Sequence, residues 1–347
     1  MPRAFVTSSV RNRGFTLVEL MIALVLGLLI SAAALQIFYT SSVNSRRQDA
    51  SSQIQDNAIF GFSQMQQNLR RANYGAKSIG TYDEFFMNHL TPQGGVVLTA
   101  PTGTSGKWLE GNLSGLVLNG AAIPKNLLSV SSSTTSISNL NGITNSDQLT
   151  IQYRSDRNDA FDCEGSTIPE GFYVVERYFV RMDTTVIPNA PGLACASAIY
   201  DYDKTSAGSA AGIDIKSYTD PKDGIKTNNL SSDGTIVIPN VDYFRVLLGI
   251  STSTGFATYP ATSNIAYRPI PSSTTQLSNN QRIVSSQIGI LARSDNPTAT
   301  PQANSALRFT VLDKTNATLN ATTTAGPTYL RNVYETTVLF RNARGGL

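Results

Sequence analysis

The side chains that could take part in catalysis are few and scattered along the chain. The only histidine, His89, lies in the turn-like stretch MNHLTPQGG (87–95), where we expect a surface loop residue. A catalytic nucleophile needs a base such as histidine within hydrogen-bond reach, and His89 is the only histidine that could serve as one. The sequence also has no Walker A loop, no dinucleotide fingerprint and no paired Cys/His metal spacing. We therefore expect no enzymatic activity, no catalytic residues and no cofactor.

One acidic stretch could bind a metal ion. SDRNDAFDCEG (155–165) brings together Asp156, Asp159, Asp162 and Glu164, and carboxylate oxygens are ligands that calcium accepts. Their spacing does not match the EF-hand pattern. A solvated loop beside Cys163 is the favoured interpretation, with a calcium loop as the alternative, so no metal site is assigned.

The sequence contains two cysteines, Cys163 and Cys195. An isolated pair in a β-rich body of an exported chain indicates one disulfide. It would close a loop of about 33 residues and stabilise the fold by about 3 to 4 kcal/mol on the chain-entropy model. The alternative is two free buried thiols, expected if the body remains in a reducing compartment.

Glu19 is the one charged residue in an apolar run over residues 15–39. About 25 helical residues span about 37 Å, which is enough to cross a bilayer. The preceding residues 1–14 carry Arg3, Arg11 and Arg13 but no acid, so we expect them in the cytoplasm and everything after Tyr39 outside it. A carboxylate at the centre of a membrane span costs about 2.5 to 3.5 kcal/mol or more, and such a residue usually makes a functional contact.

Three interpretations of this segment compete. A cleaved secretory signal peptide would use the small residues at 32–34, and a simple bitopic anchor would tolerate Glu19 near the cytoplasmic face. The third and favoured interpretation rests on GFTLVEL (14–20), which resembles the type III signal of type IV pilins and pseudopilins. The resemblance implies that a prepilin peptidase cuts between Gly14 and Phe15 and methylates the new amine of Phe15. Glu19 would then pair with this amine, within one chain or between neighbouring subunits, and set their axial register.

The helix is expected to continue without a break after the membrane span, to about Asn73. Within residues 40–74 an apolar stripe, typical of a helix packed on a globular body, comprises Ile54, Ala58, Phe62, Met65, Leu69 and Ala72. Gly75 is a plausible C-terminal cap, and Gly27 and Gly61 are possible soft points in the helix.

Residues 75–347 are expected to form a β-rich domain. Segments rich in β-branched and aromatic residues lie at 147–155, 171–182, 234–251, 285–294, 306–313 and 332–342, with turn residues between them. A long N-terminal helix followed by an antiparallel sheet defines an α+β fold.

Several motifs narrow the resemblance to the PilW family of minor pilins, which are related to J-type pseudopilins. They are the signal with its continuation ELMIALVLGLLI (19–30), then NLRRANYG (68–75), DQLTIQY (147–153), DCEG (162–165), IPNVDYFRVLLG (238–249), SSQIGILARS (285–294) and NVYETTVLFRNARG (332–345). Residues 80–146, with the only tryptophan, Trp108, match nothing in the family pattern. We interpret Arg341, Asn342 and the stretch IPNVDYF as structural features of the family.

The resemblance implies a minor pilin that helps to initiate type IV pilus assembly at or near the tip and supports twitching, adhesion or DNA uptake by the filament. Expected partners are other minor pilins, the major pilin, the prepilin peptidase, the inner-membrane assembly platform and a tip adhesin. The chain would be an inner-membrane protein with a periplasmic body before it enters the filament. The alternatives are a type II secretion pseudopilin and an anchored periplasmic binding protein.

Charge and composition agree with a protein exposed outside the cytoplasm. The net charge is only +3 and the 27 basic residues are scattered, so no direct nucleic-acid binding is expected. Ser/Thr/Asn-rich tracts such as 129–146 fit a neutral, turn-rich β surface.

Overall fold

The computed structural model describes residues 14–75, 87–100, 111–186, 189–202, 206, 212–215, 218–219, 227–252, 265–271, 277–278, 281–298, 307–320 and 329–343. The chain forms two compact units, Met1–Asp49 and Ala50–Leu347. The unassigned segment 80–146 lies partly outside the described residues, and so does Trp108.

The first element is a single long helix. Helix α1, Leu17–Arg71, contains 55 residues, and residues 72–75 form a turn that ends it. Asn73 and Gly75 in this turn both adopt a left-handed φ of 68°, a conformation that glycine adopts without strain. Gly75 thus takes part in ending the helix, as expected.

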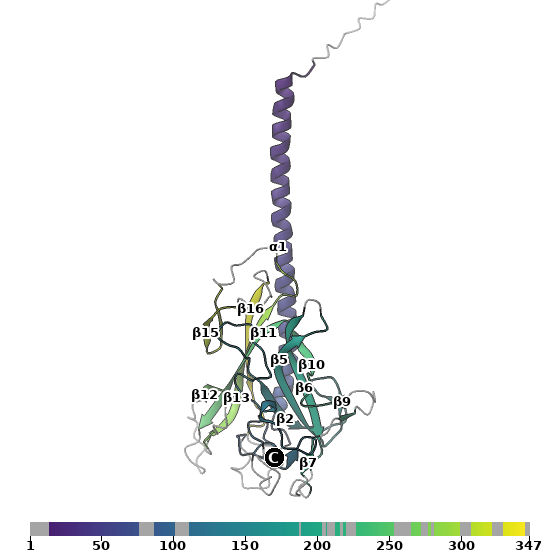
Figure 1. Ribbon diagram of the computed structural model, residues 1–347, viewed down its shortest axis with the longest axis vertical. Coiled ribbons are helices and arrows are strands. Elements are labelled where there is room, and N and C mark those ends of the chain that lie inside the picture. The colour runs from purple at the N-terminus through teal and green to yellow at the C-terminus, as the bar shows by residue number, and fades with distance from the viewer. Residues whose placement is uncertain are drawn as a thin grey trace, which may run out of the picture. The chain divides into compact units, whose positions relative to one another are not determined.

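Two four-stranded antiparallel sheets form the framework of the second unit (Figure 1). The first sheet has the order β10, β6, β5, β2, with bounds Thr235–Pro239, Ala190–Tyr200, Tyr173–Asp183 and Leu149–Arg154. The second sheet has the order β12, β11, β13, β16, with bounds Ile265–Pro269, Val241–Thr252, Gln281–Arg293 and Arg331–Leu339. A long helix followed by antiparallel sheets confirms the α+β fold.

Among the described residues, four pairs of short strands form separate two-stranded sheets, and one short 3₁₀ helix accompanies them. They are β1 (Leu116–Val117) paired with β7 (Ile213–Asp214), β3 (Ala160–Phe161) with β4 (Thr167–Ile168), β8 (Tyr218–Thr219) with β9 (Thr227–Asn228), β14 (Phe309–Val311) with β15 (Lys314–Ala317), and the 3₁₀ helix η2 (Lys125–Leu127).

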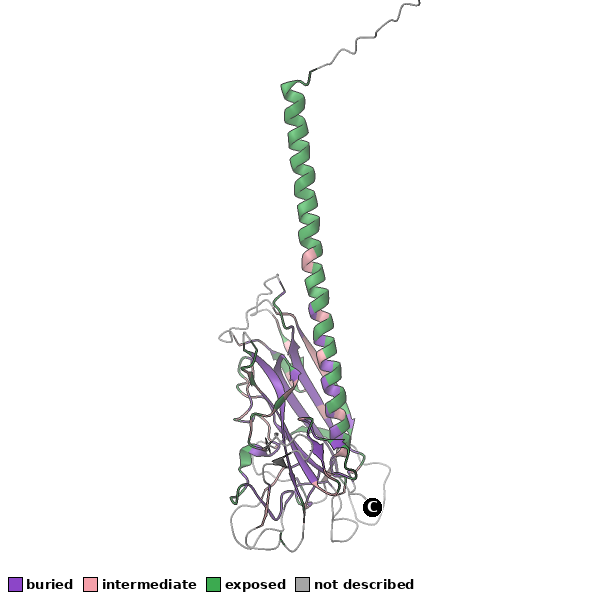
Figure 2. Cartoon of the chain, turned by 90° about the vertical axis from the view of Figure 1, so that its right-hand side faces the viewer, coloured by how far each residue is buried: buried purple, intermediate pink, exposed green. Residues whose placement is uncertain are grey.

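The predicted apolar stripe of α1 is buried. Its six members, which are Ile54, Ala58, Phe62, Met65, Leu69 and Ala72, belong to one core together with residues from both large sheets. Figure 2 shows the change along the helix, with exposed positions in the N-terminal part and buried ones recurring in the second unit. A Cβ added at Gly61 would collide with the Ile238 side chain of β10. Gly61, expected as a soft point, is therefore a site of close packing between helix and strand.

The sheets show where the strand prediction needs correction. Each of the six predicted segments contains a strand, but 234–251 divides into β10 and β11 at Asn240, whose φ is 57°. Strand β6 was not predicted, because its sequence APGLACASAIY has few β-branched residues. All eleven residues of β6 are nevertheless buried, since it lies between β10 and β5.

Residues 111–146, the longer of the two described parts of the unassigned segment, contribute to a second core. Leu113, Leu116, Ile123 and Leu128 pack with residues of β5 and β6, among them Tyr173, Val175, Ala198 and Tyr200. These four strand residues alternate with those that face α1. The first sheet is thus covered on both faces, which explains why all of β6 and the first eight residues of β5 are buried.

Candidate functional site

The residues of the prepilin-like signal stand at the start of α1. Gly14 and Phe15 are exposed, Phe15 with 83% of its surface accessible. The backbone N–H of Glu19 donates to Thr16 Oγ1 at 3.2 Å, and Thr16 with Glu19 fits the capping-box pattern in which a threonine caps a helix and a glutamate follows three residues later. The role of Thr16 was missed, although the letters TLVE carry the signal for it.

The helix that follows is apolar and unburied within its own unit. All residues from 14 to 41 are exposed, including Leu24, Leu28 and Ile30 at 59%, 62% and 71%. Among the described residues, α1 is the one helix whose length and composition would allow it to cross a membrane. The Glu19 carboxylate makes no hydrogen bond or ion pair with the described residues. A charged group of this kind in an apolar segment needs a partner from elsewhere.

The cysteines form the expected disulfide. Cys163 and Cys195 are bonded, with their Cα atoms 6.1 Å apart and a sequence separation of 32. Cys195 lies on the central strand β6 and Cys163 in the turn between β3 and β4. The bond therefore ties the acidic loop to the face of the first sheet that packs against α1.

A buried carboxylate lies beside this disulfide. Glu176 of β5 is fully buried and accepts hydrogen bonds from Tyr178 Oη at 2.7 Å, Tyr153 Oη at 2.9 Å, the Cys163 N–H at 3.0 Å and Asn68 Nδ2 at 3.2 Å. Since Asn68 belongs to α1, these bonds connect helix and sheet. No cation pairs with Glu176 among the described residues.

Burial raises the pKa of Glu176 to about 7, and the nearby Asp162 carboxylate adds to this rise, while the hydrogen bonds from Tyr178, Tyr153 and Cys163 oppose it. Glu176 and the two cysteines also form the one group of three metal-type donors found among the described residues. Because both sulfur atoms are held in the disulfide, this group cannot act as a thiolate metal site.

Of the four acidic residues considered for calcium, Asp162 and Glu164 share the partner Ser197, and the other two have separate partners. Asp162 accepts from Ser197 Oγ at 2.7 Å, and Glu164 accepts from the Ser197 N–H at 3.0 Å. Asp156 accepts from Tyr74 Oη at 3.2 Å, whereas Asp159 pairs with Arg157 on the surface at 3.3 Å. These contacts fix the loop to the sheet and to the end of the helix, and they do not gather the carboxylates around one point.

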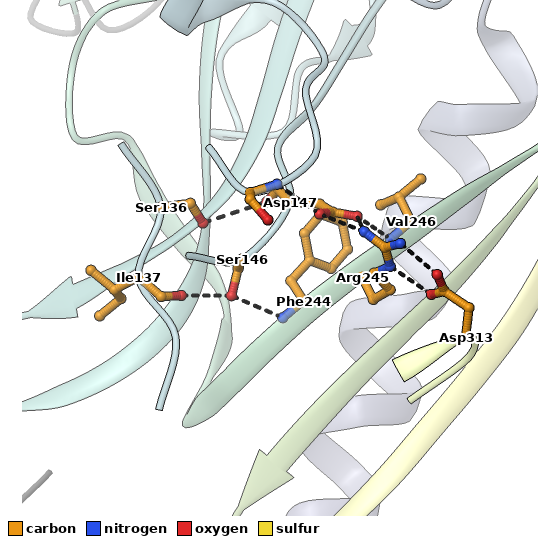
Figure 3. Close-up of polar contacts among 9 residues, drawn as sticks. Ser136, Ile137, Ser146, Asp147, Phe244, Arg245, Val246 and Asp313 are labelled. Atoms are coloured by element: carbon orange, nitrogen blue, oxygen red, sulfur yellow. Dashed lines mark hydrogen bonds and ion pairs between the residues drawn. The ribbon is translucent and has the colours of Figure 1, made fainter. Parts of the chain in front are cut away.

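A second buried polar cluster joins the two sheets (Figure 3). Arg245 of β11 bonds both oxygens of Asp147 at 3.1 Å, and Asp313 accepts from its Nε and Nη2 at 2.7 and 2.6 Å. Asp147 also accepts from the N–H groups of Val246 and Ser132 at 2.9 and 3.0 Å. Burial raises the pKa of Asp147, while Arg245 opposes the rise. The cluster is satisfied internally, which fits a structural role for the stretch that contains Arg245.

His89 corrects one expectation. It was predicted to be an exposed loop residue, but only 1% of its surface is accessible. Its backbone carbonyl accepts from Thr99 Oγ1 at 2.6 Å, and the neighbouring Asn112 amide donates to the Asn88 carbonyl at 2.7 Å. The polar side chains of this region hold the loop in place, and the histidine is enclosed with them.

Comparison with known proteins agrees with these features. Residues 177–342 match the family model of the type IV pilus-assembly protein W, and residues 10–35 match the model of the prokaryotic N-terminal methylation motif. A type IV-like pilin from Thermus thermophilus is similar in structure at 10% identity, with a TM-score of 0.35, over 84% of this chain and 98% of that chain. No significant match was found among curated proteins.

The two family matches lie at functionally different parts of the chain. The methylation motif covers the residues around Gly14, Phe15 and Glu19, and the second match covers most of both large sheets, including Arg245. A prepilin-type signal, a long apolar helix and an antiparallel body together make up a type IV pilin-like fold. The chain is therefore similar to the PilW family of type IV pilus-assembly proteins over residues 177–342, and to the N-terminal methylation motif over residues 10–35.

Proposed function

We propose that this protein is a membrane-anchored minor pilin that is processed by a prepilin peptidase. The observation that carries the proposal is the methylation-motif match around Gly14 and Phe15 at the start of an unburied apolar helix. The peptidase would cut between Gly14 and Phe15 and methylate the new amine of Phe15. Gly14 and Phe15 are both exposed, as a protease substrate must be.

After cleavage, Glu19 would have a cationic partner. Glu19 lies four positions after Phe15, a spacing of about 6 Å or one turn along a helix that includes both residues. In the low dielectric of lipid an unpaired charge is costly, so Glu19 would pair with its own amine or with that of a neighbouring subunit. Pairing between subunits would set their axial register.

The body supports a role in assembly rather than in catalysis. Residues 15–39 would cross the inner membrane with the leader 1–14 in the cytoplasm, and the body beyond residue 40 would lie in the periplasm and later at the pilus tip. Ile59 and Phe60 on α1 remain 60% and 72% exposed although they belong to the body unit, which would suit contacts with other minor pilins. Its large body would pack poorly in every turn of a shaft, which favours the tip.

The processing step is tested by the mass of the mature N-terminus. A chain that begins with methylated Phe15 supports the proposal, whereas a chain that begins at Leu35 would show cleavage by signal peptidase and would refute it.

Replacement of Glu19 tests the assembly step. Glu19→Ala should leave processing intact but abolish piliation, because the amine of the incoming subunit loses its partner. Asp56→Asn, which removes an exposed charge from the same helix, is the matched control and should assemble normally. Piliation by Glu19→Ala would contradict the assembly role. Deletion of the gene should remove pili; a loss of protein secretion with pili intact would instead assign the chain to a type II secretion system.

A further inference from the structure

A basic hollow lies in the body where α1 ends. It has a volume of about 500 Å³, within the usual range of small-molecule sites. Three separate segments line it, namely the end of α1 with its terminal turn, the end of β2 with the following loop, and the turn after β16. Its charged lining residues are Arg70, Arg71, Arg154, Arg157, Arg341 and Asp156.

The hollow concentrates positive charge. Five arginines and one carboxylate give its lining a net charge of +4, which exceeds the net charge of +3 of the whole chain. Asp156 is already engaged, because it accepts a hydrogen bond from Tyr74 Oη at 3.2 Å. Guanidinium groups around one concave surface repel each other and create a positive potential that attracts anions.

Most of these arginines have no carboxylate partner. Among the described residues, the one ion pair of the group joins Arg157 to Asp159, at 3.3 Å on the surface. Arg154 is held by a hydrogen bond from Nε to the Gly171 carbonyl at 2.9 Å, and the Arg71 guanidinium lies 5.8 Å from the centre of the Tyr153 ring. Two of the cations are therefore positioned on the wall without being neutralised.

The surrounding contacts do not use the remaining two arginine side chains. Asn73 Nδ2 donates to the Asn342 carbonyl at 2.7 Å, and Asn342 Nδ2 donates to the Arg70 carbonyl at 3.4 Å. Side-chain amides and backbone thus join the end of α1 to the turn after β16. The guanidinium groups of Arg70 and Arg341 make no hydrogen bond or ion pair within the described residues.

We propose that this hollow is a binding site for a small, multiply charged anion that carries phosphate or carboxylate groups. Guanidinium groups bind both by paired N–H···O hydrogen bonds. Arg71 and Arg154 form the positioned part of the site, and Arg70 and Arg341 supply donors that are free to turn toward the ligand. The size of the hollow suits an anion with the dimensions of a phosphorylated or acidic sugar. The inference does not depend on the role of the chain in pilus assembly.

Calorimetric titration of the full chain in a neutral detergent tests the site. The probes are inorganic pyrophosphate, glucose 6-phosphate and glucuronate, which separate a preference for phosphate from one for carboxylate. Saturable binding of at least one probe, weakened by added sodium chloride, is expected. The double variant Arg70→Gln/Arg341→Gln should weaken this binding by about tenfold or more, since two charge-assisted donors are lost.

A matched control removes the same charge elsewhere. Arg268 and Arg308 are exposed and do not line the hollow, so Arg268→Gln/Arg308→Gln should bind the probes as the native chain does. The proposal is overturned if no probe binds saturably, or if the control loses as much affinity as the hollow variant. Binding of a hexa-aspartate peptide without binding of any small probe would also overturn it, because the site would then recognise an acidic protein segment.

Discussion

Replacement of Glu176 by glutamine should remove a pH dependence from the stability of the body. Burial raises the pKa of Glu176 from its ordinary 4.5 to about 7 in the folded chain. Between these two pH values the folded state holds a proton that the unfolded state has lost, so the free energy of unfolding falls as the pH rises. At about 1.4 kcal/mol per pH unit, the full effect is about 3 kcal/mol. Below pH 4.5 and well above pH 7, Glu176 makes no further change to the free energy of unfolding as the pH varies.

Glutamine is suited to this test because it resembles the protonated acid. Its carbonyl can accept from Cys163, Asn68 and Tyr153, which all bond one oxygen of Glu176, and the Tyr178 hydroxyl can turn to accept from its amide. Urea unfolding of the full chain in neutral detergent, followed by near-ultraviolet circular dichroism between pH 4 and pH 8, gives the free energies. As the pH rises over this range, the free energy of unfolding of the native chain should fall by about 3 kcal/mol relative to that of Glu176→Gln.

The control for this comparison is Glu170→Gln, a change at an exposed glutamate in the turn before β5. Its unfolding free energy should follow that of the native chain at every pH. Parallel curves for the native chain and Glu176→Gln would refute the reasoning, and so would a native chain that gains stability relative to the variant as the pH rises. Either result would mean that the carboxylate is ionised in the folded state without a penalty.

Two further changes test the packing of the body. Gly61→Ala should lower the free energy of unfolding by about 1 to 2 kcal/mol in urea titrations, because the new Cβ meets Ile238 and this cost exceeds the gain in helix propensity. The control is Gly27→Ala, which has nothing within 4 Å of the added Cβ and should leave the stability of the body unchanged. An equal effect of both changes would contradict the close contact. Replacing Cys163 and Cys195 together by alanine should cost about 3 to 4 kcal/mol, given a sequence separation of 32, and an unchanged urea midpoint would show that the disulfide contributes nothing.

The helix and the strands differed in how well the sequence predicted them. The spacing of Ile54, Ala58, Phe62 and Met65 repeats with the period of an α-helix, so the face that packs on the sheets was predictable. Strand β6 was not, because alanine, glycine and cysteine have little intrinsic β preference. Its conformation depends on pairing with β5 and β10 and on burial from both faces, and these are tertiary effects.

The buried polar clusters were the least predictable features. Alternation along β5 places Glu176 on the same face as Val174 and Tyr178, which pack in the core against α1. A strand pattern alone gives no indication that a charged residue on that face will be buried, since its donors come from α1, β2, β5 itself and the turn that holds Cys163. Three of these four contacts join residues 13 to 108 positions apart, and such contacts cannot be read from local spacing.

A comparison of the charged groups supports the proposed role of Glu19. Glu176 is buried without a cation, but four hydrogen-bond donors surround it. Arg245 is buried between two carboxylates. Both groups are thus satisfied inside the body, whereas the Glu19 carboxylate has no donor among the described residues and lies in an apolar segment. In contrast to these two groups, a carboxylate without a partner in an apolar helix would be explained by a partner that arises later, and the proposed cleavage before Phe15 would create an amine that could serve as this partner.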